Sequence, residues 1–127
     1  MELYDYIGGE VAIRSIVETF YPKVLAHPAL APIFPDDMGP LMEKQFMFLT
    51  QFFGGPPLYT NTHGNPMMKA RHAPFPITPE RAEAWLACMR STLEEVIPSV
   101  ETRAMLLERL KGPAYFFINT EEAAGSV

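Results

Sequence analysis

The chain has 127 residues, of which 48% are hydrophobic and 20% charged, so a single domain with its own hydrophobic core is expected over residues 1–127. The net charge of −5 comes from scattered carboxylates, and no Lys/Arg cluster supplies the basic surface that nucleic-acid binding needs. No signal-peptide pattern opens the chain, and no window approaches the roughly 18 apolar residues of a membrane span. These features predict a soluble, cytoplasmic protein that binds neither nucleic acid nor membrane.

Apolar residues recur at spacings of three and four in the first half of the chain, which indicates two amphipathic helices. The first is expected from about Glu10 to Ala26 and the second from about Gly39 to Phe53. The prolines between residues 28 and 35 require a sharp turn between these helices. Turn-forming residues then dominate Gly54 to Pro66, where we expect a long loop.

Two further helices are indicated in the second half. Thr78-Pro79-Glu80 provides an N-cap, a first-turn proline and an acidic residue, so a helix is expected to begin at about Pro79 and to end before Pro98. Ser99 can cap the last helix, in which Gly112-Pro113 predicts a kink or a break. Residues 121–127 are expected to fray. No alternating strand pattern is present, so the predicted fold class is all-α.

A histidine stands where a short helix must end, in the run from residue 68 to residue 76, beside Arg71 and before two prolines. His72 is therefore the candidate ligand for a haem iron. His27 and His63 lie in segments predicted to be solvated connections and are weaker candidates. Because the chain has no C-x-x-C-H motif, a haem would be held non-covalently.

Three polar residues interrupt the apolar faces of different helices: Tyr21, Gln45 and Trp85. Each can donate a hydrogen bond, from a phenol, an amide or an indole respectively. If the three side chains meet in one dry cavity, they form a cage of donors that stabilises a partially negative ligand such as bound dioxygen.

Five segments in order resemble the truncated haemoglobins of group II, a match that spans roughly Tyr6 to Asn119. These segments are Phe20-Tyr21, Pro32-Ile33-Phe34-Pro35, Phe53-Gly54-Gly55-Pro56, Arg71-His72-Ala73-Pro74-Phe75 and Ala84-Trp85-Leu86-x-Cys88-Met89. The resemblance implies a truncated two-over-two globin fold around haem b, in which His72 is the proximal iron ligand that ends a short helix.

The resemblance also implies roles on the opposite, distal side of the haem. Tyr21 resembles the family's distal tyrosine, Phe34 the aromatic residue packed on the haem, and Trp85 the tryptophan typical of this group. Leu41 and Gln45 fall one turn apart on the distal helix. Leu41 occupies the place where many globins have a distal histidine, so the hydrogen bonds to a ligand are expected from Tyr21, Trp85 and Gln45.

Further residues are candidates for contact with the cofactor. Apolar walls are expected from Phe48, Met68, Ile77 and Met89, and propionate partners from Arg71, Lys44 and Tyr59. Ordinary roles stay open for all of these positions: His72 as a loop histidine, Tyr21 bonded to a backbone carbonyl, Trp85 as core, Gln45 bonded to water, and the cations as solvated charges. Cys88 is expected to be a small buried hydrophobic residue.

Three hypotheses for the function follow. The first is reversible, high-affinity binding of dioxygen and other small gaseous ligands, supported by an unidentified reductase that keeps the iron ferrous. The second is a haem enzyme acting on peroxide, nitric oxide or sulfide, which Leu41 disfavours because it supplies no distal base. The third is a cofactor-free helical interaction module, which leaves His72 unexplained. A monomer or a homodimer is compatible with each.

Overall fold

The computed structural model describes residues 2–120, which form helices connected by turns, with no strand among them. In chain order these elements are α1 (Leu3–Tyr6), α2 (Gly9–Ala26), the 3-10 helix η1 (Ala31–Ile33), α3 (Gly39–Phe52), α4 (Leu58–His63), α5 (Met68–His72), α6 (Pro79–Val96) and α7 (Val100–Phe116). The all-α fold class is thus confirmed. The fraying expected for residues 121–127 lies outside the described part of the chain.

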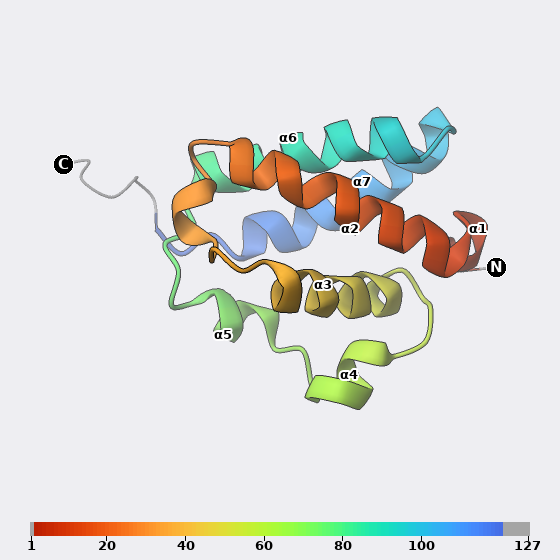
Figure 1. Cartoon of the computed structure of the whole chain (residues 1–127), viewed down its shortest axis with the longest axis horizontal. Helices are drawn as coiled ribbons and strands as arrows, with labels where there is room; N and C mark the ends of the chain where they lie inside the picture. Colours follow the sequence, from red (N-terminus) through yellow and green to blue (C-terminus); the bar gives the residue numbers. More distant parts are fainter. Residues whose placement is uncertain (1, 121–127) are drawn as a thin grey trace.

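Four long helices are arranged as two pairs in the two-over-two manner, α2 with α3 and α6 with α7. Helix α2 packs against both α3 and α6, and α6 packs against α7. Figure 1 shows α2 and α3 running in opposite directions, with the α6–α7 hairpin beside α2 and the short α4 and α5 on the far side of α3. Within residues 2–120, no helix has the length and hydropathy needed to cross a membrane.

The helical starts predicted in the second half are confirmed in their cap geometry. Thr78 Oγ1 accepts a hydrogen bond from the Arg81 N–H at 3.1 Å, at the start of α6. Ser99 Oγ accepts one from the Thr102 N–H at 3.2 Å, at the start of α7. Each cap satisfies one of the backbone donors that the first turn of a helix leaves unpaired.

The long loop expected from Gly54 to Pro66 is wrong in part, because α4 forms within it. Gln51, near the end of α3, accepts a hydrogen bond from the Thr60 N–H at 2.9 Å and donates to the Thr60 hydroxyl at 2.8 Å. Local composition favours turns here, and this pair of tertiary hydrogen bonds helps to hold a short helix that is too short to be stable alone.

The break expected at Gly112-Pro113 does not occur, since α7 continues through Pro113 to Phe116. The proline lies in the last turn, where it costs one intrahelical hydrogen bond and few residues remain to be redirected. Its own carbonyl still accepts the Phe117 N–H at 3.0 Å, and Leu106, Leu107 and Leu110 keep α7 anchored in the core.

Candidate haem-binding site

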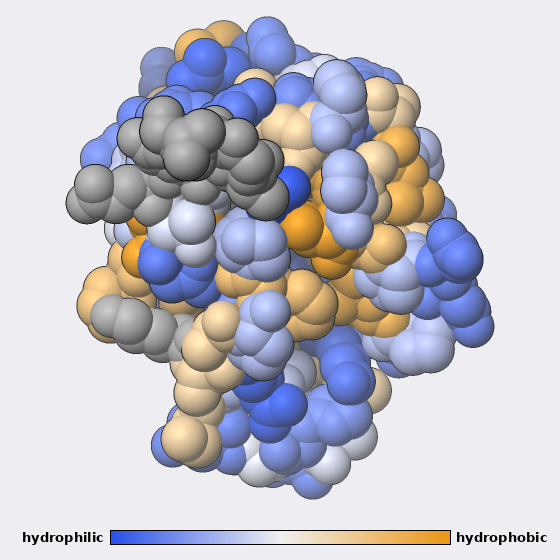
Figure 2. Space-filling model, turned by 90° about the vertical axis from the view of Figure 1, so that its left-hand side faces the viewer, coloured by the Kyte–Doolittle hydropathy of each residue, from blue (hydrophilic) through white to orange (hydrophobic). Residues whose placement is uncertain are grey.

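A cavity of about 690 Å³ lies between the two helix pairs and reaches α4 and α5. This volume is within the roughly 300–1,000 Å³ typical of small-molecule and cofactor sites. The side chains named from the sequence that line it are Tyr21, Phe34, Leu41, Lys44, Gln45, Phe48, Tyr59, Met68, Arg71, His72, Ile77 and Trp85. Figure 2 shows the face of the molecule that lies on the left in Figure 1, where hydrophobic residues are exposed between hydrophilic ones.

His72 ends α5 and lines the cavity with a half-buried ring. Its Nδ1 lies 2.7 Å from the carbonyl oxygen of Met68, one turn earlier in the same helix. Because a carbonyl can only accept, Nδ1 carries the proton, and the neutral ring then has its lone pair on Nε2. This arrangement is the one expected of a metal-ligating histidine, whose other nitrogen is held by a backbone carbonyl.

Phe117 supports the same ring from α7's C-terminal end, a contact that the sequence did not reveal. The two rings are stacked, with centroids 4.4 Å apart and planes inclined by 9°. Phe117 lies on the apolar stripe of the last helix, but no sequence pattern relates that stripe to His72. Only the tertiary fold brings them together.

The three predicted donors lie on the same cavity. Tyr21 is 3% exposed, and its ring meets Phe20 edge-on at a centroid distance of 5.0 Å; Trp85 meets Phe20 similarly at 5.1 Å. Among the side chains that the structure describes, those of Tyr21, Gln45 and Trp85 have no hydrogen-bond partner. Burial raises the pKa of the Tyr21 phenol, so the hydroxyl keeps its proton and remains a donor.

Positively charged side chains line part of the cavity, and they differ in the hydrogen bonds they already make. Lys44 is exposed. Arg71 donates from Nε to the Pro66 carbonyl at 2.7 Å, and its guanidinium lies 5.5 Å from the centre of the Tyr59 ring. Lys44 and the remaining guanidinium donors of Arg71 fit the carboxylates of a haem.

Arg81 is a lining residue that sequence reasoning missed. It donates from Nε to the Ala29 carbonyl at 2.8 Å and from Nη1 to the Pro76 carbonyl at 2.7 Å. These bonds tie the turn after α2 to the segment before α6. Arg81 thus links two segments beside the cavity, and its partner Ala29 lies 52 positions earlier in the chain.

Four other positions are placed as follows. Met89, expected as a cavity wall, is instead 1% exposed in the hydrophobic core and does not line the cavity. Tyr59 is buried on α4 rather than on a loop. His27 is half-buried and accepts the Ala29 N–H at Nδ1, while His63 is exposed.

The residues present fit a non-covalent haem. The lining is mainly apolar, one histidine offers a free Nε2, and cations at the cavity can face carboxylates. An all-helical, two-over-two fold around such a cavity defines the truncated globin class.

Comparisons with known proteins agree with this class. The sequence profile of the family described as bacterial-like globin matches residues 2–116. Group 2 truncated hemoglobin YjbI of Bacillus subtilis (strain 168) is 50% identical over 120 residues, which cover 94% of this chain and 90% of the relative. The chain belongs to the bacterial-like globin family and is a truncated haemoglobin of group II, as its sequence motifs predicted.

Solved structures support the fold directly. The group II truncated hemoglobin from Bacillus anthracis has 47% sequence identity and a TM-score of 0.93, covering 100% of this chain and 98% of that one. The truncated oxygen-avid haemoglobin from Bacillus subtilis has 49% identity and a TM-score of 0.89, covering 94% and 100%. The two-over-two globin fold is thereby confirmed, and membership of the globin family implies haem binding.

Proposed function

We propose that this globin binds haem b through His72 Nε2 and holds dioxygen or another small gaseous ligand with hydrogen bonds from Tyr21, Trp85 and Gln45. The observation that carries the proposal is that all three donors line one cavity without protein partners among the described residues. Haem iron supplies reversible binding of diatomic ligands. The name of the Bacillus subtilis relative, an oxygen-avid haemoglobin, supports the same function here.

The donors act through their surroundings. A hydrogen bond in a dry, low-dielectric cavity is electrostatically stronger than one in water. Leaving a buried donor unpaired is also costly, so a ligand that accepts from the Tyr21 hydroxyl satisfies a group that burial withdraws from water. Slow ligand release follows, because departure must break bonds that water is poorly placed to replace.

The distal wall favours binding over redox catalysis. Leu41 is apolar, and His72 is the single histidine among the described lining residues, so no second imidazole is available as a general base for peroxide cleavage. Turnover of peroxide, nitric oxide or sulfide is the alternative outcome. Reduction by a partner reductase, a cytoplasmic location and a monomeric or homodimeric state stay predictions.

The decisive experiment measures oxygen release and peroxide turnover on one haem-reconstituted sample. Stopped-flow displacement of dioxygen is expected to give slow release, with peroxide turnover close to that of free haem. Fast release combined with efficient peroxide turnover would overturn the binding proposal in favour of the enzyme. A colourless protein after reconstitution would overturn both.

A further inference from the structure

We infer that the segment following α7, through Phe117 and Asn119, positions the proximal histidine and thereby controls how firmly the cofactor is held. The inference rests on the proposed role of His72 as iron ligand. It assigns a function to two residues that the distal chemistry does not involve.

The first contact is made with the imidazole ring itself. The Phe117 ring lies parallel to that of His72, at a centroid distance of 4.4 Å and an interplanar angle of 9°. The bond from His72 Nδ1 to the Met68 carbonyl fixes one edge of the imidazole, and the Phe117 face restricts rotation about the remaining side-chain torsions. The two contacts together restrict the orientation of the ring.

The second contact is made with the backbone around His72. Asn119 Nδ2 donates to the Phe75 carbonyl at 2.9 Å and, over a longer 3.4 Å, to the His72 carbonyl. Its Oδ1 accepts the Ile77 N–H at 3.0 Å, and its own N–H donates to the Ile77 carbonyl at 3.0 Å. The side chain of Asn119 therefore holds the connection between α5 and α6 in two places, near its start at His72 and Phe75 and near its end at Ile77.

This bracing matters because α5 has little support of its own. The helix is five residues long, shorter than an isolated helix needs for stability in water, and Met67 before it has a left-handed φ of 44°, which is costly for a residue with a side chain. A short, strained helix holds its terminal residue accurately only when other parts of the fold fix it.

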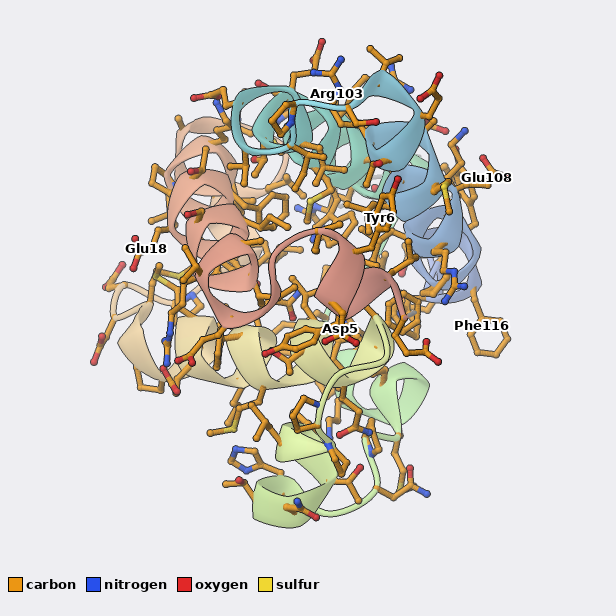
Figure 3. The ribbon with its side chains drawn as sticks, turned by 90° about the vertical axis from the view of Figure 1, so that its right-hand side faces the viewer. Asp5, Tyr6, Glu18, Arg103, Glu108 and Phe116 are labelled. Atoms are coloured by element: carbon orange, nitrogen blue, oxygen red, sulfur yellow. The ribbon has the colours of Figure 1, made fainter. Side chains whose placement is uncertain are left out.

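The neighbouring Phe116 provides a matched control. It projects away from the helices at the edge of the molecule in Figure 3 and is 60% exposed. Phe116→Leu and Phe117→Leu make the same chemical change one position apart. The Phe116 ring lies 6.1 Å from the Phe117 ring and is tilted by 57° to it, whereas the Phe117 ring is stacked on His72. Asn61→Ala, an exposed asparagine on α4, is the corresponding control for Asn119→Ala.

The experiment follows haem loss to an excess of apoglobin and the iron–histidine stretching band of the ferrous protein by resonance Raman. Removal of an outer partner of a metal ligand typically costs about 10–100-fold, so we expect haem loss roughly tenfold faster in Phe117→Leu and Asn119→Ala, with a shifted or broadened band. Asn61→Ala is expected to match the wild type, and Phe116→Leu to change haem loss much less than Phe117→Leu does, because the Phe116 ring touches Phe117 and is not stacked on His72.

A haem-independent measurement completes the test. In the apoprotein, Asn119→Ala is expected to speed hydrogen exchange at the Ile77 amide, which donates to Asn119 Oδ1. If the wild type binds haem through His72 but both variants keep its haem-loss rate and Raman band, the inference fails and the proposed function stands. If the wild type shows no iron–histidine band, the proposed function fails first.

Discussion

The ring of Tyr21, on α2, meets the ring of Phe34 edge-on, with centroids 6.3 Å apart. Phe34 follows η1, so the contact joins the end of the proline-rich turn to the helix that carries the buried phenol. The Phe20 ring also meets the Tyr21 ring edge-on, with centroids 5.0 Å apart, so aromatic packing holds the Tyr21 ring. The hydroxyl is therefore positioned without using its hydrogen bond, which stays available to a ligand.

Tyr21→Phe should accelerate dioxygen release roughly tenfold, which corresponds to the loss of about 1.4 kcal/mol from one hydrogen bond. The ring packing is kept, so the fold and haem content should not change. Stopped-flow displacement measures the rate. Tyr115→Phe is the control, since the Tyr115 hydroxyl donates to Glu83 at 2.6 Å on the exposed surface. Equal rates in wild type and Tyr21→Phe would contradict the role of this donor.

Trp85→Phe should also speed release, by less than Tyr21→Phe if the more exposed indole makes the weaker bond. Double substitution with Tyr21→Phe tests whether the two donors act on one ligand, because groups that share a partner are not additive. Strictly additive effects would indicate that the two donors act independently, and an unchanged rate in Trp85→Phe would show that the indole does not hold the ligand.

His72→Ala should abolish normal axial ligation and reduce haem retention, because no other histidine lines the cavity within residues 2–120. Absorption spectra after reconstitution, with and without added imidazole, check this. His63→Ala changes an exposed histidine and should leave the spectrum intact. A normal ferrous spectrum in His72→Ala without imidazole would remove His72 from its assigned role.

Gly55→Ala should destabilise the fold. An added Cβ would lie 2.7 Å from the Tyr4 ring and 2.9 Å from the Thr50 carbonyl oxygen, and the latter is backbone that cannot move aside. Overpacking of this kind costs about 1–3 kcal/mol. Gly112→Ala is the control, because an added Cβ there would have nothing within 4 Å, and its effect should stay below about 1 kcal/mol. Urea unfolding of the apoprotein measures both, and equal stabilities would refute the clash.

Cys88 gives a dependence on pH. Burial raises the pKa of its thiol above the ordinary 9.0, although the positive charge of Lys23 opposes the shift. The folded state therefore retains this proton longer than the unfolded state does. The resulting stabilisation is complete below about pH 9 and is lost as the pH rises through the folded-state pKa.

The difference in unfolding free energy between wild type and Cys88→Ala should accordingly shrink as the pH rises above 9. Denaturant titrations at several pH values test this, and at pH 8 the folded wild type should react slowly with a thiol reagent. A constant difference across the range, with rapid labelling at pH 8, would show that Cys88 is accessible.

Local sequence patterns were sufficient for the helical framework. Apolar spacing placed the long helices, and the caps at Thr78 and Ser99 fixed where two of them begin, because these signals act within one or two turns. The same patterns failed at α4, where the bonds from Gln51 to Thr60 override a turn-rich composition. Of the kink or break expected at Gly112-Pro113, the break does not occur, since the helix continues through Pro113 and buried leucines anchor α7.

The chemistry of the site likewise depends partly on the sequence alone and partly on the tertiary structure. The sequence by itself determined which residue types are available: one well-placed histidine, His72, and three donors interrupting apolar stripes. Tertiary structure decided that Tyr21, Gln45 and Trp85 share one cavity, that Met89 stays in the core, and that the end of α7 meets His72. The bond from Asn119 to His72 joins residues 47 positions apart, and contacts of this kind depend on how helices pack rather than on any local periodicity.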